Sequence, residues 1–323
     1  MDATTRPPGW KVLLAFSMIY FVWGSTFLAI RVGVREVPPL LLAGLRFLLA
    51  GVVLYIWMSA TGVPSPRRRE WLSAALLAVF IFALDYGLLF WAEERVPSGT
   101  AAVMLATIPA FMALSEILFL RTQQLTFRLA MALLVGLAGV FVLVSHSLGL
   151  GEAPIDRRGA VALLVAGLSW SIASALTRKM TLPESKAMSS AAQMLCGGVF
   201  LLIASSALGE FHSFHWYSVS AKVWWALAYL IVAGSIVAFT AYVWLLHHES
   251  PTKVGTYAYV NPVVAVALGY FLGGEAVGLR TVLGTVLVLV SVVVIVTKTQ
   301  SAISSQRSAR EHFSQSNLEK QNL

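Results

Sequence analysis

The sequence predicts an all-α integral membrane protein with ten transmembrane helices, arranged as two five-helix repeats of inverted topology. Three observations predict this fold class: the composition, ten apolar segments of similar length, and an internal repeat. Of the 323 residues, 58% are hydrophobic and only 12% are charged, whereas a soluble domain has about 25% charged residues. The net charge of +8 is therefore first a signal of membrane orientation and only then of a binding partner.

The ten apolar segments each approach the length of about 20 residues that a transmembrane helix needs. Most of them begin or end at aromatic or basic residues, which suit the membrane–water interface. Little sequence lies between them, so no catalytic domain is expected outside the membrane. The segments cover residues 11–30, 39–58, 71–91, 98–120, 126–145, 159–178, 187–208, 222–246, 252–273 and 279–298.

The segments divide the chain into two repeats with short connections. We expect a first five-helix repeat over residues 11–145 and a second over residues 159–298, joined by a loop at 146–158. Residues 1–10 form a short N-terminal segment. The polar tail at 299–323 is rich in Ser and Gln, and we expect it to be disordered.

The distribution of Lys and Arg predicts the orientation. If the N-terminus is cytoplasmic, fifteen of these residues fall on the cytoplasmic side and seven on the outer side. Because basic residues concentrate in cytoplasmic loops, both termini are expected in the cytoplasm.

The internal repeat is visible as two aligned stretches in each half. WGSTFLAIR at 23–31 matches WSIASALTR at 170–178, an offset of 147 residues, and AGLRFLLAGVVL at 43–54 matches SAAQMLCGGVFL at 190–201 at the same offset. Each half holds five helices, an odd number, so the second half enters the membrane in the opposite sense to the first. Inverted repeats of this kind build transporters, which hold a solute near the midplane where the repeats meet.

A matched pair of prolines lies late in each repeat. At an offset of 153 residues, ATIPAFMAL at 106–114 meets YVNPVVAVA at 259–267, which places Pro109 on Pro262. Proline lacks the N–H of a helical hydrogen bond and crowds the preceding turn, so both positions are candidate bends. For either helix alone, a packing kink remains an equally good interpretation.

Three ionisable residues away from the segment ends stand out as candidates: Arg46, Asp85 and Glu116. Such groups are costly in a membrane and often mark solute or proton pathways. Arg46 and Asp85 lie at similar depth in the outer half, and we hypothesise that they form an ion pair, directly or through water. Alternatively, each reaches the interface or a backbone carbonyl separately. Asp85 and Glu116 are candidates for proton coupling, although Glu116 can instead pair with Arg121.

The candidate solute pathway combines these charges with polar and aromatic residues. Trp23 and Trp170 are related by the repeat, Gln193 occupies the position that matches Arg46, and two tyrosines and Asn261 surround Pro262. Most aromatic residues in membrane helices serve packing, which is the alternative for each of them. The candidate residues are Trp23, Ser25, Arg46, Asp85, Tyr86, Trp170, Gln193, Tyr257, Tyr259 and Asn261.

The sequence resembles the EamA-type ten-helix permeases of the drug/metabolite transporter superfamily. The residues that carry the resemblance are WGSTF at 23–27, PPLLLAGLRFLLAG at 38–51, VPSGTAAV at 96–103, YVNPVVAVALG at 259–269 and GGE at 273–275. The resemblance implies export or exchange of amino acids, metabolites or drug-like compounds across a bacterial inner membrane. The first half departs from the pattern, because its acid is Glu116, deeper in the helix than Glu275 is in the second half.

The remaining expectations concern partners and excluded functions. No Walker A, GxSxG, HExxH or dinucleotide motif is present, and the single cysteine, Cys196, permits neither a disulfide framework nor a thiolate metal site. We therefore expect no enzyme activity, cofactor, metal or nucleic-acid binding. The expected partners are a small organic solute, the lipid bilayer and, as a candidate coupling ion, the proton, with a monomer or homodimer as the assembly. An importer of a sugar or other metabolite, or a membrane sensor that transports nothing, is the alternative.

Overall fold

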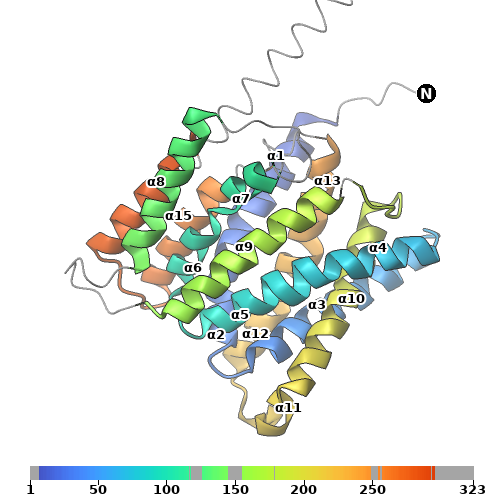
Figure 1. Ribbon diagram of the computed structural model, residues 1–323. Helices are drawn as coiled ribbons and strands as arrows, with labels where there is room; N and C mark the ends of the chain where they lie inside the picture. Colours follow the sequence, from blue (N-terminus) through green and yellow to red (C-terminus); the bar gives the residue numbers. More distant parts are fainter. Residues whose placement is uncertain are drawn as a thin grey trace, which may run out of the picture.

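The protein is all-helical wherever its computed structural model describes it (Figure 1). The description covers residues 7–115, 117, 126–144, 155–177, 179–248, 254, 257–291, 293 and 294. The expected loop at 146–158 therefore lies mostly outside the described residues, and the polar tail lies entirely outside them.

Six helical spans are long and apolar enough to cross a bilayer: 9–33, 39–60, 68–93, 157–177, 186–207 and 221–245. Four shorter apolar helices cover residues 98–112, 127–142, 260–271 and 279–291. Each of the ten apolar segments thus contains a helix, and the membrane class expected from the sequence is confirmed.

The first repeat contains α1 (Gly9–Ser17), η1 (Met18–Val22), α2 (Trp23–Gly33), α3 (Pro39–Ala60), α4 (Arg68–Ala78), η2 (Val79–Tyr86), α5 (Gly87–Glu93), α6 (Ser98–Leu105), α7 (Ile108–Ser115) and α8 (Phe127–Val144). The second contains α9 (Arg157–Thr177), α10 (Lys186–Ala207), α11 (Glu210–Ser213), η4 (Trp216–Ser218), α12 (Ala221–Tyr229), η5 (Leu230–Val237), α13 (Ala238–His248) and α15 (Tyr257–Phe271). The helix α1 lies at one end of the bundle and α11 at the opposite end (Figure 1).

The repeat expected from the sequence is present in the helix bounds. α3 and α10 are both 22 residues long, and their first residues, Pro39 and Lys186, lie 147 positions apart. The two spans built from α4 to α5 and from α12 to α13 each contain an eight-residue π-helical segment, η2 and η5. π-Helical segments are rare and are frequent at functional sites, so their occurrence in the same helix of both repeats points to a shared role.

Glycines set the packing of α3 against α10. A side chain at Gly44 would meet Leu202, one at Gly51 would meet the backbone of Leu195, and one at Gly198 would meet the backbone of Leu48. As the residue numbers rise along α3 they fall along α10, so the two helices run antiparallel along this interface. Small residues permit such close approach of membrane helices.

The matched prolines have different local structures. α6 ends at Leu105 and α7 begins at Ile108, so the helix is interrupted just before Pro109. In contrast, Pro262 lies inside the continuous helix α15. The two related positions are therefore not equivalent bends.

The close contact at Gly198 generates a stability prediction. Gly198→Ala should lower the melting temperature of the purified protein by several degrees, because the added methyl group collides with the Leu48 backbone and overpacking costs about 1–3 kcal/mol. Gly9→Ala is the matched control, since nothing lies within 4 Å of its added methyl group. Equal melting temperatures for the two variants, measured by fluorescence-detected size exclusion, would contradict the packing.

Candidate functional site

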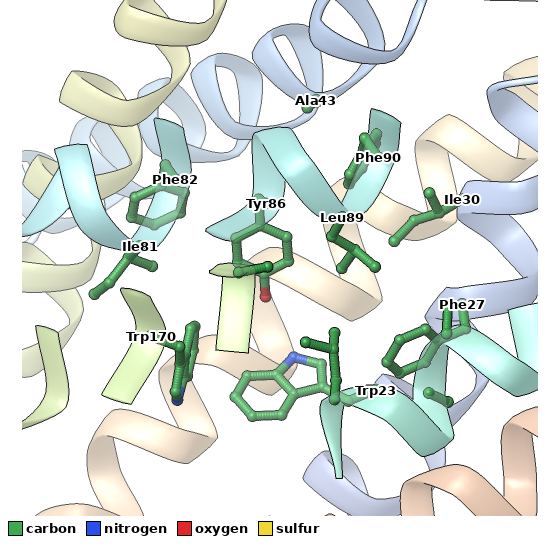
Figure 2. Packing of buried hydrophobic residues seen from close by; sticks show 14 of the residues in the cluster. Trp23, Phe27, Ile30, Ala43, Ile81, Phe82, Tyr86, Leu89, Phe90 and Trp170 are labelled. Atoms are coloured by element: carbon green, nitrogen blue, oxygen red, sulfur yellow. The ribbon is translucent and has the colours of Figure 1, made fainter. Parts of the chain in front are cut away.

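Five aromatic rings from both repeats meet in the middle of the bundle. We call this group, Trp23, Tyr86, Trp170, Tyr242 and Tyr257, the aromatic centre. Its ring centroids lie 5.1–6.2 Å apart between contacting pairs, and each residue is at most 9% exposed. Figure 2 shows Trp23, Tyr86 and Trp170 pointing toward one another. Edge-to-face and tilted ring pairs of this kind add about 0.5–1.5 kcal/mol each beyond their burial.

The repeat-related pair Trp23 and Trp170 forms the core of this centre, with a centroid distance of 6.1 Å in an edge-to-face arrangement. Tyr257 packs on Trp23 at 5.3 Å. Tyr242 contacts both tryptophans and Tyr257, and sequence reasoning missed it. At the offset of 153 residues its counterpart is Leu89, so the repeat offered no aromatic match that could have identified it.

Arg46 is buried beside the aromatic centre, with 1% of its side chain exposed. Its Nε donates to Ser235 Oγ at 2.8 Å, and Ser235 Oγ in turn donates to the carbonyl of Leu230 at 3.0 Å. The guanidinium lies over the rings of Phe47 and Tyr86, at 4.6 and 5.3 Å from their centroids. Cation–π contacts of this type stabilise a desolvated cation.

Asp85 lies in η2, and 4% of it is exposed. Within the described part of the chain, Asp85 Oδ1 and Arg46 Nη1 have no hydrogen-bond partner. The direct form of the ion pair that we hypothesised between them is absent from these described side chains, and a pair bridged by water stays a prediction. Asp85 and Tyr86 are adjacent in η2, and adjacent side chains of a helix project in different directions. Tyr86 is the one of the two that lies against the guanidinium.

Asn261 is occupied in holding the backbone of η1. With its amide nitrogen facing this segment, Asn261 donates to the carbonyls of Ile19 at 3.1 Å and Tyr20 at 2.8 Å. In a membrane such carbonyls need an internal partner. The structure therefore gives Asn261 a structural contact with η1, and its place in the wall of a solute pathway stays a prediction.

The other candidate residues are scattered. Ser25 Oγ donates to the carbonyl of Val22 at 2.7 Å and lies 2.6 Å from the hydroxyl of Tyr229. Gln193, the counterpart of Arg46, donates to Ser189 Oγ on its own helix at 3.1 Å. Glu116 and the side chain of Tyr259 lie outside the described residues.

Hydrogen bonds between the repeats satisfy the irregular backbone around the site. Trp23 Nε1 in the first repeat donates to the carbonyl of Gly234 in η5 at 3.1 Å. Ser169 Oγ in the second repeat donates to the carbonyl of Phe80 in η2 at 2.8 Å. Each π-helical segment of the matched pair is thus held by a side chain of the opposite repeat.

The residues that the structure describes contain no group of three or more His, Cys, Asp or Glu side chains able to hold a metal ion. The polar atoms at the aromatic centre are a guanidinium, a carboxylate and hydroxyl groups. This chemistry suits a solute with its own charge and an apolar body.

Ser235 provides a test of how Arg46 is held. Ser235→Ala leaves a buried N–H of Arg46 unpaired, which costs about 1–3 kcal/mol and should lower the melting temperature. Ser174→Ala is the control, because Ser174 bonds only the carbonyl of Trp170 on its own helix. If the two variants have the same melting temperature, the hydrogen bond from Arg46 to Ser235 does not stabilise the protein.

Asn261 provides a second test. Asn261→Asp replaces the amide donor with a carboxyl group facing two backbone carbonyls, so the melting temperature should fall by an amount that corresponds to about 1–3 kcal/mol. If the variant has the melting temperature of the parent and only its solute flux changes, Asn261 acts in the solute pathway and not in holding η1.

Comparison with known proteins identifies the family. The profile of the EamA-like transporter family matches residues 10–145 and again residues 157–297. The inner membrane transporter YedA of Escherichia coli K12, itself named as uncharacterized, is 39% identical over 263 residues, which cover 81% of this chain and 82% of YedA. The transporter YoaV of Bacillus subtilis 168, also named as uncharacterized, is 25% identical over 280 residues, covering 86% of this chain and 94% of YoaV.

A crystal structure that is 21% identical shares the fold, with a TM-score of 0.62 over 89% of this chain and 97% of that chain. The family is one of transporters and not of enzymes, in agreement with the expectation from the sequence. With two matches that together span most of its length, the chain belongs to the EamA-like transporter family.

Proposed function

We propose that this protein moves a small organic solute across a bacterial inner membrane by alternating access between its two repeats. The family and the inner-membrane relative YedA support this function and location. The repeat architecture supports the mechanism, since inverted repeats can adopt two mirrored states, each open to one side.

The proposed topology has ten transmembrane helices in two inverted five-helix repeats, over residues 11–145 and 159–298, with both termini in the cytoplasm. The antiparallel packing of α3 against α10 supports the inversion. The excess of Lys and Arg on the side of the termini supports the orientation.

The observation that carries the proposal is the pair of unpartnered charged groups beside buried aromatic rings. Arg46 Nη1 and Asp85 Oδ1 are both buried without a hydrogen bond among the described residues, and Tyr86, which follows Asp85 in the chain, lies against the Arg46 guanidinium. Buried polar groups are normally satisfied, so an unsatisfied one requires an explanation. Arg46 would bind an anionic group of the solute, and the aromatic centre would contact its apolar part.

Asp85 would then serve as a proton-binding group, because a carboxylate in a membrane is stabilised by either a cation or a proton. Tyr257 and Trp170 complete the pathway wall. Export or exchange is proposed in preference to import on the resemblance of the sequence motifs.

Reconstitution into proteoliposomes tests the function. Neutral, anionic, cationic and zwitterionic metabolites would be offered with and without a pH gradient. Asp85→Asn should lose accumulation driven by the pH gradient but retain solute exchange, whereas Arg46→Met should reduce both by about tenfold or more, the effect of losing about 1.4 kcal/mol.

Glu94→Gln is the matched control, because the Glu94 carboxylate is partly exposed and pairs with the adjacent Arg95. If no solute moves under any gradient, the transport function is wrong. If Asp85→Asn and Arg46→Met both behave as the parent does, the site assignment is wrong.

A further inference from the structure

Three carboxylates at one end of the bundle each bind a helix N-terminus that belongs to the other repeat. This end, which we call the distal face, holds residues 33–39, 93–98 and 207–221 and lies opposite the end where α1 begins. The three residues are Glu36, Glu210 and Glu275.

Glu275, which follows α15 in the second repeat, binds the start of α6 in the first. It accepts from the backbone N–H and the hydroxyl of Ser98, at 2.8 and 2.7 Å, and from the N–H of Gly99 at 3.1 Å. A carboxylate is favoured there because the N-terminus of a helix carries partial positive charge and unpaired N–H groups.

The other two carboxylates make the same kind of contact in both directions. Glu210 in the second repeat accepts from the N–H of Leu41, at 2.8 Å, in the first turn of α3. Glu36 in the first repeat accepts from the N–H and the hydroxyl of Ser220, at 2.7 and 2.8 Å, at the start of α12. Charge-assisted bonds of this kind are roughly twice as strong as neutral ones.

Buried side chains lie beside the Glu275 contact, whereas Glu36 and Ser220 are themselves exposed. Val96 and Ser98 are fully buried although they lie at a helix junction, and Val37 is 5% exposed. A cap within one repeat survives a movement of the repeats against each other. A cap between repeats breaks when that end of the bundle opens.

We propose that Glu36, Glu210 and Glu275 hold the distal face closed, and that solute passage through this face requires all three contacts to break. We call these three contacts between the repeats the latches. This inference rests on the proposed alternating access. The hydrogen bonds from Ser220, with a further contribution from Lys222, lower the pKa of Glu36 below its ordinary value. Above this lowered pKa, Glu36 is therefore ionised and its hydrogen bonds with Ser220 are intact. They weaken as the pH falls through the lowered pKa.

Cysteine accessibility tests the latches directly. In a Cys196→Ala background, Val96→Cys reports on the distal face and Ala15→Cys, 8% exposed before substitution, reports on the opposite end. Each protein is placed in lipid nanodiscs and labelled with a charged maleimide. Glu36→Gln, Glu210→Gln and Glu275→Gln should each raise the labelling rate at Val96→Cys about fivefold, equivalent to about 1 kcal/mol, and leave Ala15→Cys unchanged or slower.

Glu94→Gln is again the control, since this distal carboxylate bonds its own neighbour and not the other repeat. Unchanged labelling of Val96→Cys in the three variants would overturn the proposal. Equal increases at both reporters would also overturn it, because they indicate general loosening. Solute flux separates this proposal from the proposed transport function. If the parent protein moves solute but the three variants leave the labelling of Val96→Cys unchanged, only the latches are contradicted. If the variants change the labelling but the parent protein moves no solute, only the transport function is contradicted.

Discussion

The constraint on which this structure depends is that a backbone inside a bilayer must find its hydrogen bonds within the protein. Regular helices meet this constraint alone, whereas π-helical segments and helix breaks do not. Here the partners come from the opposite repeat. Trp23 bonds η5, Ser169 bonds η2, and Asn261 bonds η1. Ser171 similarly donates to the carbonyl of Ile108 beside the α6–α7 break, at 3.2 Å. Bonds within a repeat also contribute, such as that from Ser235 Oγ to the carbonyl of Leu230 in η5, but each half supplies partners to irregular segments of the other, so the two halves interlock.

The same contacts indicate which parts of the bundle can move. In a rocking motion, displacement grows with distance from the axis. The glycine contacts between α3 and α10 are reciprocal, with Gly51 on Leu195 and Gly198 on Leu48. An interface of this symmetry is suited to be the axis, because it looks alike in both mirrored states. Contacts at the ends of the bundle are displaced most in such a motion, and at the distal face three carboxylates bind backbone N–H groups of the opposite repeat.

Much of the fold was predictable because hydropathy and repetition are properties of the chain itself. The ten apolar segments, the 147-residue offset and the meeting of Trp23 with Trp170 follow from the order of residues. The π-helical segments do not, because hydropathy is insensitive to hydrogen-bond register. The direction of Asp85 depends on that register, so similar depth in the membrane could not establish a direct contact with Arg46. The contacts of Glu275 and Glu36 join loops about 180 residues apart, and no local pattern indicates them.

An inverted repeat with two identical halves would give its two mirrored conformations equal energy. The two repeats of this chain differ at the positions of the distal carboxylates. The first-half counterpart of Glu275 is Thr122, and the first-half counterpart of Glu210 is Val63. Neither side chain is an anion, so neither can reproduce a carboxylate cap at the matching position of the opposite end. The same asymmetry separates Arg46 from its counterpart Gln193 in the interior. An inverted repeat with identical halves has no preferred state. Under the proposed alternating access, the acids at the distal face stabilise the state closed on that side, and binding of solute or proton supplies the free energy that opens it.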